Sequence, residues 1–259
     1  IGSSMYFDLS KGTIPILTTK KVAWKTCLKE LLWFVSGDTS NVNLKKQNVK
    51  IWNANASREF LDSRGLTHLA EDDLGPVYGH QWRHFNATYN DCNTDYSGKG
   101  VDQLAYIINA LKDPVQRYSR RLVLSAWNPC QIDEMALPPC HVLMQFNVIE
   151  DKLSCCLYQR SGDVGLGVPF NIASYSFLTY ILADFCGLKP GEFIYNLGNA
   201  HVYDDHIDAL KEQSKLKPHD FPSLNIKKRE RSNIEDYTIE DFELVNYVSH
   251  PPVTMKMRA

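Results

Sequence analysis

Residues 141–160 read His-Val-Leu-Met-Gln-Phe-Asn-Val-Ile-Glu-Asp-Lys-Leu-Ser-Cys-Cys-Leu-Tyr-Gln-Arg, and this stretch decides the fold. Two apolar-rich runs, His141–Ile149 and 152–160, flank the pair Glu150-Asp151, which predicts two antiparallel strands joined by a tight two-residue turn. Both runs carry apolar residues at alternate and at adjacent positions, so we expect both faces of the sheet to be covered. One face would pack on helices and the other on a second subunit.

The turn also fixes which residues lie opposite each other. If the first residue after it pairs with the last residue before it, His141 lies opposite Arg160 and Cys140 lies opposite Ser161. Neighbouring side chains across two strands have Cβ atoms about 4.5–5.5 Å apart, so Cys140 would lie beside an arginine. A nearby guanidinium favours the thiolate, which is the reactive form of cysteine. On spacing alone, Cys140 is either a reactive thiol or one of several inert buried thiols.

Helical and extended patterns alternate along the rest of the chain. Apolar residues recur at close to 3.6-residue spacing or form long buried runs, which predicts helices at 23–35, 102–113, 171–185 and 204–213, with Asn171 as the cap of the third. A further strand is expected at 121–127, and polar, glycine-punctuated loops at 53–75 and 86–100. We therefore predict one domain over residues 1–259. Its fold class is α/β (α+β type), with one large mixed β-sheet flanked by helices and a sheet face used for dimerisation.

The composition is that of an ordinary globular protein. Of 259 residues 44% are hydrophobic, and a formal net charge of −2 gives no positive field for nucleic acid or an anionic membrane. The seven cysteines form no CxxC pair and no cluster with zinc-ligand spacing, which is typical of reduced thiols. No apolar run approaches the roughly 18–20 residues that span a bilayer, and residues 1–21 do not resemble a signal peptide. These features predict a cytoplasmic protein without metal, membrane or DNA; nuclear or mitochondrial pools and weak RNA binding stay open.

Cys140 belongs to a long series of motifs. The segments that carry the resemblance are Leu137-Pro138-Pro139-Cys140-His141, residues 158–175 from Tyr158 to Tyr175, Glu30-Leu31-Leu32-Trp33-Phe34, Gly75-Pro76-Val77-Tyr78-Gly79, Ser119-Arg120-Arg121, Ser125-Ala126-Trp127-Asn128 and His201-Val202-Tyr203. A long ordered set of this kind is far more specific than one short motif. The chain resembles the thymidylate synthases, and the resemblance extends over essentially its whole length.

The resemblance implies a reaction and its catalytic residues. The family methylates dUMP to dTMP, and 5,10-methylenetetrahydrofolate supplies both carbon and hydride and leaves as dihydrofolate. Cys140 is then the thiolate that attacks C6 of uracil, and Arg160 helps to keep it ionised. Glu30, at the edge of the apolar face of its predicted helix, is expected to have a raised pKa and to relay protons; by itself it is equally an ordinary helix-border residue. Tyr78 is expected to assist removal of the C5 proton.

By the same resemblance, two overlapping sets of residues bind the substrates. The amide of Asn171 would read the uracil edge because it offers both a donor and an acceptor, and Asp163 would orient the pteridine and stabilise the pyrimidine. The residues expected at dUMP are Arg120, Arg121, Gln159, Arg160, Ser161, Gly162, Asp163, Asn171, His201 and Tyr203. Arg120 and Arg121 would come from the partner subunit of a homodimer. The residues expected at the folate are Ile51, Trp52, Asn55, Asp163, Leu166, Gly167 and Phe170, and no Rossmann fingerprint indicates a nicotinamide cofactor.

The sequence departs from the family pattern at several places. The family has an arginine in an N-terminal loop that also grips the phosphate, and this chain begins after it, so we expect an incomplete phosphate site. The tail at 255–259 is slightly shorter than the family tail that closes over the ligands. Asn199 stands where an aspartate is common, and Gly165 replaces a frequently larger residue.

Three alternatives stay open at this point. A Cys-His hydrolase would pair Cys140 with His141 or His201, although adjacent strand residues point to opposite faces. A non-enzymatic nucleotide- or RNA-binding protein is disfavoured by the balanced charge. A dCMP hydroxymethylase of the same superfamily would carry an aspartate at the position of Asn171, so Asn171 favours dUMP.

Overall fold

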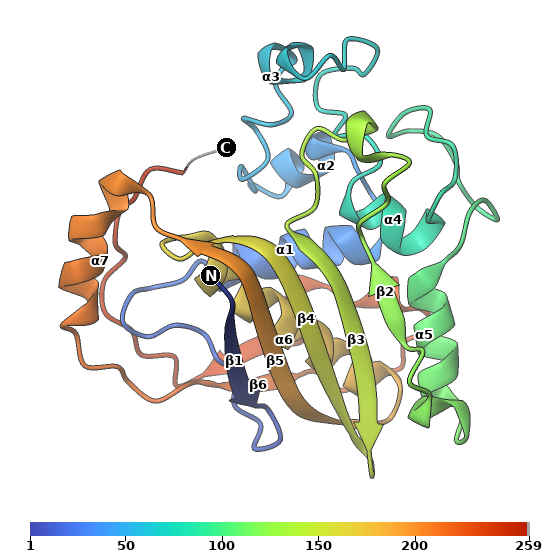
Figure 1. Ribbon diagram of the computed structural model, residues 1–259. Helices are drawn as coiled ribbons and strands as arrows, with labels where there is room; N and C mark the ends of the chain where they lie inside the picture. Colours follow the sequence, from blue (N-terminus) through green and yellow to red (C-terminus); the bar gives the residue numbers. More distant parts are fainter. Residues whose placement is uncertain (258–259) are drawn as a thin grey trace.

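A five-stranded mixed sheet forms the centre of the computed structural model, which describes residues 1–257 (Figure 1). The strands run in the order β1 (Ser3–Asp8), β5 (Lys189–His201), β4 (Lys152–Asp163), β3 (His141–Ile149) and β2 (Val123–Ser125). β4 and β5 are parallel, and every other neighbouring pair is antiparallel. The predicted α/β class with one large mixed sheet is confirmed.

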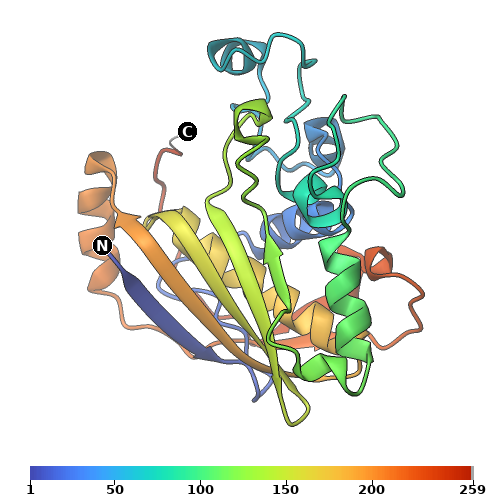
Figure 2. The same cartoon turned by 45° about the vertical axis from the view of Figure 1, so that its right-hand side comes forward.

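One long helix makes the parallel pairing possible. Parallel neighbours need a crossover connection, and α6 (Gly167–Phe185) carries the chain from the end of β4 to the start of β5. It packs on both strands, and α1 (Trp24–Val35) packs on α6 in turn. Both helices lie behind the sheet in Figures 1 and 2, so they cover one of its faces. α6 is therefore buried on most sides, as its nearly continuous apolar sequence predicts.

The shorter elements surround this framework. Most of them lie above one end of the sheet or along its β2 edge (Figure 1). They are α2 (Asn41–Lys46), α3 (Arg58–Ser63), α4 (Tyr78–His84), α5 (Gln103–Lys112), α7 (Ile207–Ser214) and a two-stranded sheet of β6 (Ser223–Ile226) and β7 (Phe242–Val245). Among the residues described, no helix has the length and apolarity needed to cross a membrane.

Several predicted boundaries are wrong. The helix expected from Asn171 begins four residues earlier, at Gly167, so Asn171 lies inside α6 and does not cap it. Pro169 does not prevent this because it lies in the first turn, where its missing N–H would have had no partner. The strand expected at 121–127 is limited to β2, the helix expected at 204 starts as a 3₁₀ turn before α7, and the loop at 53–75 contains α3.

Next to Cys140 the register differs from the predicted one because of a β-bulge in β3. From Leu143 to Ile149 the pairing with β4 is as predicted, but a shift between His141 and Leu143 places His141 opposite Gln159. Arg160 then donates its backbone N–H to the carbonyl of Cys140 at 2.9 Å. The predicted pairs of His141 with Arg160 and of Cys140 with Ser161 are therefore wrong by one residue. The extra residue on β3 causes the shift, and it brings Cys140 directly beside Arg160.

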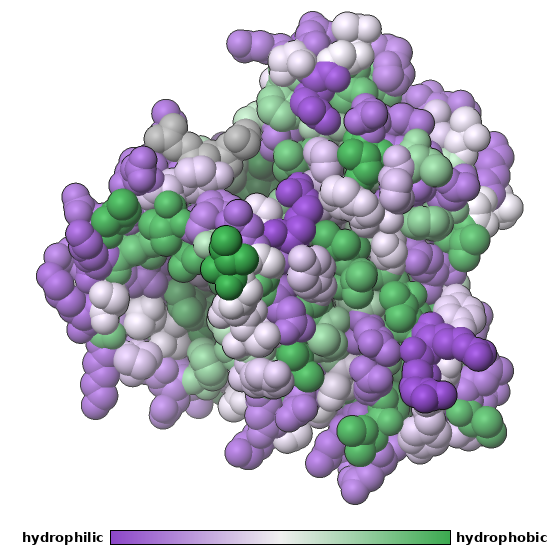
Figure 3. Space-filling model, in the orientation of Figure 1, coloured by the Kyte–Doolittle hydropathy of each residue, from purple (hydrophilic) through white to green (hydrophobic). Residues whose placement is uncertain are grey.

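The face of the sheet away from α6 carries an uncharged group of side chains. We call the outer sheet face the group formed by Tyr6, Leu143, Gln145, Tyr158, Ile194 and Asn196, which alternate along their strands with buried or partly buried residues. Tyr6 is 71% exposed and Tyr158 is 42% exposed. On this side of the molecule, apolar side chains are interspersed with hydrophilic ones across the strands (Figure 3).

Candidate active site

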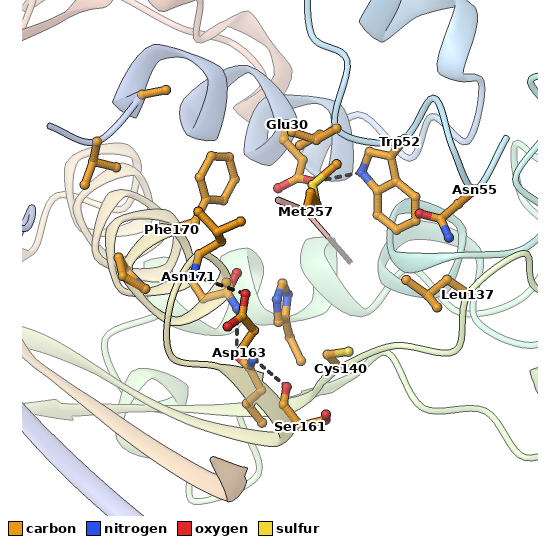
Figure 4. Close-up of a pocket in the computed structure, with 18 of the residues that line it drawn as sticks. Glu30, Trp52, Asn55, Leu137, Cys140, Ser161, Asp163, Phe170, Asn171 and Met257 are labelled. Carbon is orange, nitrogen blue, oxygen red and sulfur yellow. Dashed lines mark hydrogen bonds between the residues drawn. The ribbon is translucent and has the colours of Figure 1, made fainter. Parts of the chain in front are cut away.

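A cavity of about 540 Å³ opens where the carboxyl ends of β4 and β5 meet the start of α6. Glu30 and Trp52 form one wall, Cys140 and Ser161 lie across from them, and Asn171 lies between (Figure 4). The predicted site residues that line this cavity are Cys140, Glu30, Tyr78, Asn171, Asp163, Gln159, Ser161, His201, Tyr203, Ile51, Trp52, Asn55, Leu166, Gly167 and Phe170. Segments far apart in the sequence therefore meet at one place.

Four predicted residues do not line the cavity. Arg160 lies just outside it, in contact with Cys140. Gly162 packs against Leu197 and Val168, where a Cβ would lie 2.7 and 2.9 Å from their side chains. Arg120 and Arg121 are exposed on the segment before β2, away from the cavity of their own chain.

The thiol of Cys140 is fixed by its backbone and by Arg160. The hydroxyl oxygen of Tyr78 accepts the backbone N–H of Cys140 at 2.8 Å. One guanidinium nitrogen of Arg160 lies 3.8 Å from Cys140 Sγ, and Pro138 and Pro139 hold that guanidinium through their carbonyl oxygens at 3.0 and 2.9 Å. The Pro-Pro-Cys turn therefore positions both the sulfur and the cation beside it.

The electrostatic balance at Cys140 differs from the prediction. Burial raises the pKa of the thiol above its ordinary value, and the Arg160 guanidinium opposes this rise without overcoming it. The expected contact is present and favours the thiolate, but burial acts in the opposite direction. Arg160 stabilises negative charge that develops on the sulfur when the proton leaves.

A hydrogen-bonded set of amides fixes Asn171. Its Nδ2 donates to Gln159 Oε1 at 3.0 Å, and the hydroxyl of Tyr195 donates to the same oxygen at 2.5 Å. Gln159 Nε2 donates to the carbonyl of Ser161 at 2.7 Å, so the amide of Gln159 cannot flip without losing all three bonds. Asn171 is thus held with one N–H committed, and its remaining polar groups are available to a ligand.

Asp163 organises the loop that leads into α6. Its two carboxylate oxygens accept the backbone N–H groups of Gly165 and Leu166 at 2.9 and 3.1 Å. The ammonium group of Lys20, which is buried, donates to the carbonyl of Gly165. Burial lowers the pKa of Lys20, and the carboxylate of Asp163 opposes this shift. The loop therefore presents a carboxylate and a cation on one side of the cavity.

Glu30 is a buried acid whose one hydrogen-bond partner within residues 1–257 is Trp52. It is only 6% exposed, and Trp52 Nε1 donates to its Oε1 at 2.7 Å. Burial raises its pKa to about 7, and the bond from Trp52 opposes the rise. The raised pKa expected for Glu30 is thus confirmed, and near neutral pH this carboxyl is able both to give and to take a proton.

The raised pKa makes folding stability depend on pH in a defined direction. A Glu pKa of about 7 in the folded state, against about 4.3 when unfolded, means that the folded state holds its proton more tightly. The contribution of Glu30 to stability therefore falls as pH rises from about 4.3 to about 7. The free energy of unfolding of Glu30→Gln minus that of the wild type should therefore increase by about 3 kcal/mol from pH 4.5 to pH 8, because the variant lacks this titration. Urea unfolding of both proteins across this range measures the difference.

The exposed Glu59 provides the matched control for this titration. Glu59→Gln makes the same chemical change at an exposed position that does not line the cavity, and we expect its unfolding curve to follow that of the wild type. If the Glu30→Gln and wild-type curves run parallel from pH 4.5 to 8, the titration assigned to Glu30 is wrong.

His141 is a neutral, enclosed ring. It lies between the rings of Tyr78 and Tyr175, with centroids 5.0 and 5.2 Å away, and burial lowers its pKa to about 4. Both Cys140 and His141 line the cavity, so the expectation that they point to opposite faces is wrong; β3 begins only at His141, and the alternation of a strand does not extend to Cys140. The partner of the sulfur is nevertheless Arg160, so the geometry does not favour a Cys-His dyad.

The far end of the cavity is aromatic and apolar. Trp52, Phe170 and Leu166 form much of its wall, together with the tail residues Val253 and Met257. Asn55 is buried beside them, and its Nδ2 has no hydrogen-bond partner within residues 1–257. An apolar cleft with one unpaired donor suits a flat ring system that carries an acceptor. Arg258 and Ala259, the end of the tail expected to close over the ligands, lie outside the described residues.

Several residues at or next to the cavity were not predicted from the sequence. Lys20 precedes the first predicted helix in a polar run, where no periodicity distinguishes a buried lysine from an exposed one. His206 was expected within the helix predicted at 204–213, where nothing marked it as a site residue, but it ends a 3₁₀ turn and is fully buried. Tyr195 lies on β5, a strand that was not predicted. The inward alternation of Phe193, Tyr195 and Leu197 is the signal that could have found it.

The family model and the relatives found by comparison with known proteins all belong to the same family. The family model described as thymidylate synthase matches residues 1–259. Thymidylate synthase of Homo sapiens is 54% identical over 247 residues, which cover 95% of this chain and 78% of that protein. Thymidylate synthase of Saccharomyces cerevisiae is 52% identical over 260 residues, 97% of this chain and 84% of that protein. The bifunctional dihydrofolate reductase-thymidylate synthase of Leishmania amazonensis is 53% identical over 258 residues, and the chain spans about half of its length, 49%.

Proposed function

Since the chain belongs to the thymidylate synthase family, we propose that the protein converts dUMP to dTMP, with 5,10-methylenetetrahydrofolate as the donor of carbon and hydride. The observation that carries the proposal is one cavity that holds Cys140 beside Arg160, the fixed amide of Asn171 and the buried acid Glu30. The test is the appearance of dihydrofolate, followed by absorbance, when the purified chain receives both substrates. A rate that does not depend on dUMP would count against the proposal.

Cys140 is the nucleophile of the proposed reaction. Its sulfur bonds to C6 of uracil, its proton leaves as the bond forms, and Arg160 stabilises the developing thiolate. C5 then has enolate character and bonds to the methylene carbon of the folate as the bond from that carbon to N10 breaks and N10 takes a proton. Loss of the C5 proton and of the remaining folate nitrogen, N5, leaves an exocyclic methylene, which takes a hydride from the tetrahydrofolate so formed as the sulfur departs. The products are dTMP and dihydrofolate, so no external reductant is needed.

Glu30 and Tyr78 take part in the transfer of protons to and from the pyrimidine. A pKa of about 7 lets Glu30 pass protons to and from the pyrimidine through water. Burial holds the pKa of Tyr78 well above its ordinary value, so this phenol keeps its proton. Tyr78 accordingly acts through its hydroxyl, which holds the Cys140 backbone and orients the water that takes the C5 proton.

Asn171 selects the base, and the residues around it bind the rest of dUMP. The Oδ1 and the remaining N–H of Asn171 face the N3–H and O4 of uracil. His201 and Tyr203, whose rings meet edge-on at 5.2 Å, would bind the deoxyribose hydroxyl. Gln159 and Ser161 complete the pocket, and Arg160 contributes to phosphate binding.

The aromatic end of the cavity binds the folate. Trp52, Phe170 and Leu166 would contact its flat rings, with Ile51 and Gly167 at the border, and the unpaired Nδ2 of Asn55 would donate to it. Asp163 lies between the two ligands, where its carboxylate orients the pteridine. Within residues 1–257 no group of side chains is arranged to hold a metal ion, and the proposed reaction uses neither metal nor nicotinamide.

The proposal includes a homodimer that shares its active sites. The outer sheet face has exposed tyrosines among uncharged side chains, and the charged pair Asp8 and Glu192 lies at its border, which is typical of a subunit interface with a polar rim. Arg120 adjoins this face, because its carbonyl accepts from Gln145 at 3.1 Å. A two-fold axis through the outer sheet face would let Arg120 and Arg121 reach the phosphate site of the partner.

One domain over residues 1–259 and a cytoplasmic location are also parts of the proposal. All seven cysteines are free thiols, which supports a reducing compartment.

Subunit mixing tests the shared site. A Cys140→Ser subunit still donates both arginines, and an Arg120→Glu/Arg121→Glu subunit still carries the cysteine, so each homodimer should be nearly inactive. Refolding the two together gives about half mixed dimers with one complete site each, which should restore roughly a quarter of wild-type activity. Mass spectrometry confirms the mixed dimers. If the activity of the refolded mixture does not exceed the summed activities of the two mutant homodimers, the arginines belong to the active site of their own chain.

A further inference from the structure

One fully buried histidine holds the C-terminal tail, which we define as residues 253–257. His206 has no exposed surface, and its Nε2 lies 2.8 Å from the backbone oxygen of Lys256. A carbonyl oxygen only accepts, so Nε2 must carry the hydrogen and donate it. Val253 and Met257 of the same tail line the cavity. This hydrogen bond therefore fixes the tail in the position from which it covers the cavity.

The other side of the same ring faces Asp163. Nδ1 of His206 lies 3.7 Å from Asp163 Oδ1 and has no hydrogen-bond partner within the described part of the chain. The ring also meets Tyr203 edge-on, with centroids 5.5 Å apart. One side chain thus contacts the tail on one side and two cavity-lining residues on the other.

Gly165 permits this close packing. A Cβ at this position would lie 2.7 Å from His206 Nδ1, 3.2 Å from Asp163 Oδ1 and 3.2 Å from Met255 Sδ. The histidine, the carboxylate and the tail therefore meet at the one position in the loop that has no side chain. The departure from the family pattern at Gly165 has a physical role in this arrangement.

We propose that His206 is a positioning residue, which anchors the tail over the cavity at Lys256 and connects it to Asp163. Without the N–H of His206, the carbonyl of Lys256 loses its protein donor, and the tail leaves the cavity more often. Val253 and Met257 then no longer complete the aromatic end of the cavity. The kinetic consequence rests on the proposed function, whereas the anchoring itself does not.

Limited trypsin digestion tests the anchoring directly. Cleavage after Lys256 acts on the carbonyl that His206 holds, and it releases residues 257–259. We expect His206→Phe, which keeps a ring against Tyr203 but has no donor, to be cleaved there about tenfold faster than the wild type, the order expected for one lost hydrogen bond. The mass of the intact subunit identifies the cleavage, and the thermal unfolding midpoint shows that the variant is folded.

Two further variants make the result specific. His206→Gln places an amide N–H where Nε2 lies, so it should restore protection of Lys256 to within about threefold of the wild type. His250→Phe removes a similar bond, from a histidine Nε2 to the Lys217 carbonyl at 2.9 Å, at a site that does not line the cavity. It should leave cleavage after Lys256 unchanged. Equal cleavage rates for folded His206→Phe and wild type would overturn the proposal, and so would acceleration by His250→Phe to the same extent.

Kinetics then separate the anchoring from the proposed function. If both hold, His206→Phe raises KM for methylenetetrahydrofolate about tenfold, while the Kd of dUMP measured without folate stays within about twofold. Faster cleavage combined with an unchanged folate KM would leave the anchor standing and remove its link to folate binding. A wild-type chain without activity but with tail protection that depends on His206 would overturn the proposed function alone.

Discussion

Cys140→Ser is expected to lower kcat by a factor on the order of 10⁶, the loss seen when an enzyme loses its nucleophile. A serine hydroxyl is far less acidic than a thiol, and Arg160 at 3.8 Å stabilises a thiolate but cannot supply the missing acidity. Binding of dUMP should change only a few-fold, because the Asn171–Gln159 pair and the residues around it do not depend on the sulfur. Turnover and equilibrium binding of dUMP measure the two effects separately.

The control for this prediction is another cysteine. Cys130 is exposed and does not line the cavity, so Cys130→Ser should retain wild-type turnover. Appreciable turnover by Cys140→Ser, in a preparation shown by mass to be free of wild-type subunits, would remove Cys140 from the nucleophile role.

Asn171→Asp is expected to shift the preference for dUMP over dCMP by roughly 10⁴-fold, because a site that loses a matched hydrogen bond to a buried polar edge discriminates strongly. Gln159 Oε1 accepts from Asn171 at 3.0 Å and is itself held by Tyr195. The new carboxyl can keep that bond only as its protonated form, and its other oxygen then accepts from the cytosine amino group. The uracil carbonyl at the same place would face an acceptor.

The ratio of kcat/KM for the two nucleotides measures this shift. Asn199→Asp is the control, because Asn199 lies on β5 and does not line the cavity; it should leave the ratio unchanged. A ratio that does not move in Asn171→Asp would show that another residue reads the base.

The pairing of the hairpin formed by β3 and β4 could be predicted from local sequence, except for the pair that His141 forms with Gln159. Alternation and a two-residue turn fix the register from Ile149 back to Leu143. The bulge beyond Leu143 arises because Cys140 and Arg160 pack with the Pro-Pro turn and with Tyr78, which comes from a distant segment. The parallel partner β5 was missed for a similar reason, since its pairing with β4 depends on the crossover of α6 and not on neighbouring residues.

The cavity was predicted better than the interactions within it. Motif resemblance placed Cys140, Asn171 and Glu30 in one site, and the helical position of Glu30 indicated its burial. The pKa of Cys140 could not be predicted from its arginine neighbour, because the degree of burial outweighs that one charge. His206 could not be predicted either. It ends the 3₁₀ turn before an exposed helix, and the residues that enclose it, Asp163, Gly165 and the tail at Lys256, come from distant segments.

The most direct test of the account uses dUMP with fluorine in place of hydrogen at C5. The reaction as proposed must release the C5 hydrogen as a proton, and fluorine cannot leave in that way, so the chemistry stops with the sulfur still bonded to C6. With methylenetetrahydrofolate present, the subunit mass should rise by the sum of nucleotide and folate. Fragmentation of tryptic residues 122–152 should place the added mass on Cys140 and not on Cys130. No mass increase, or an increase at another cysteine, would contradict covalent catalysis by Cys140.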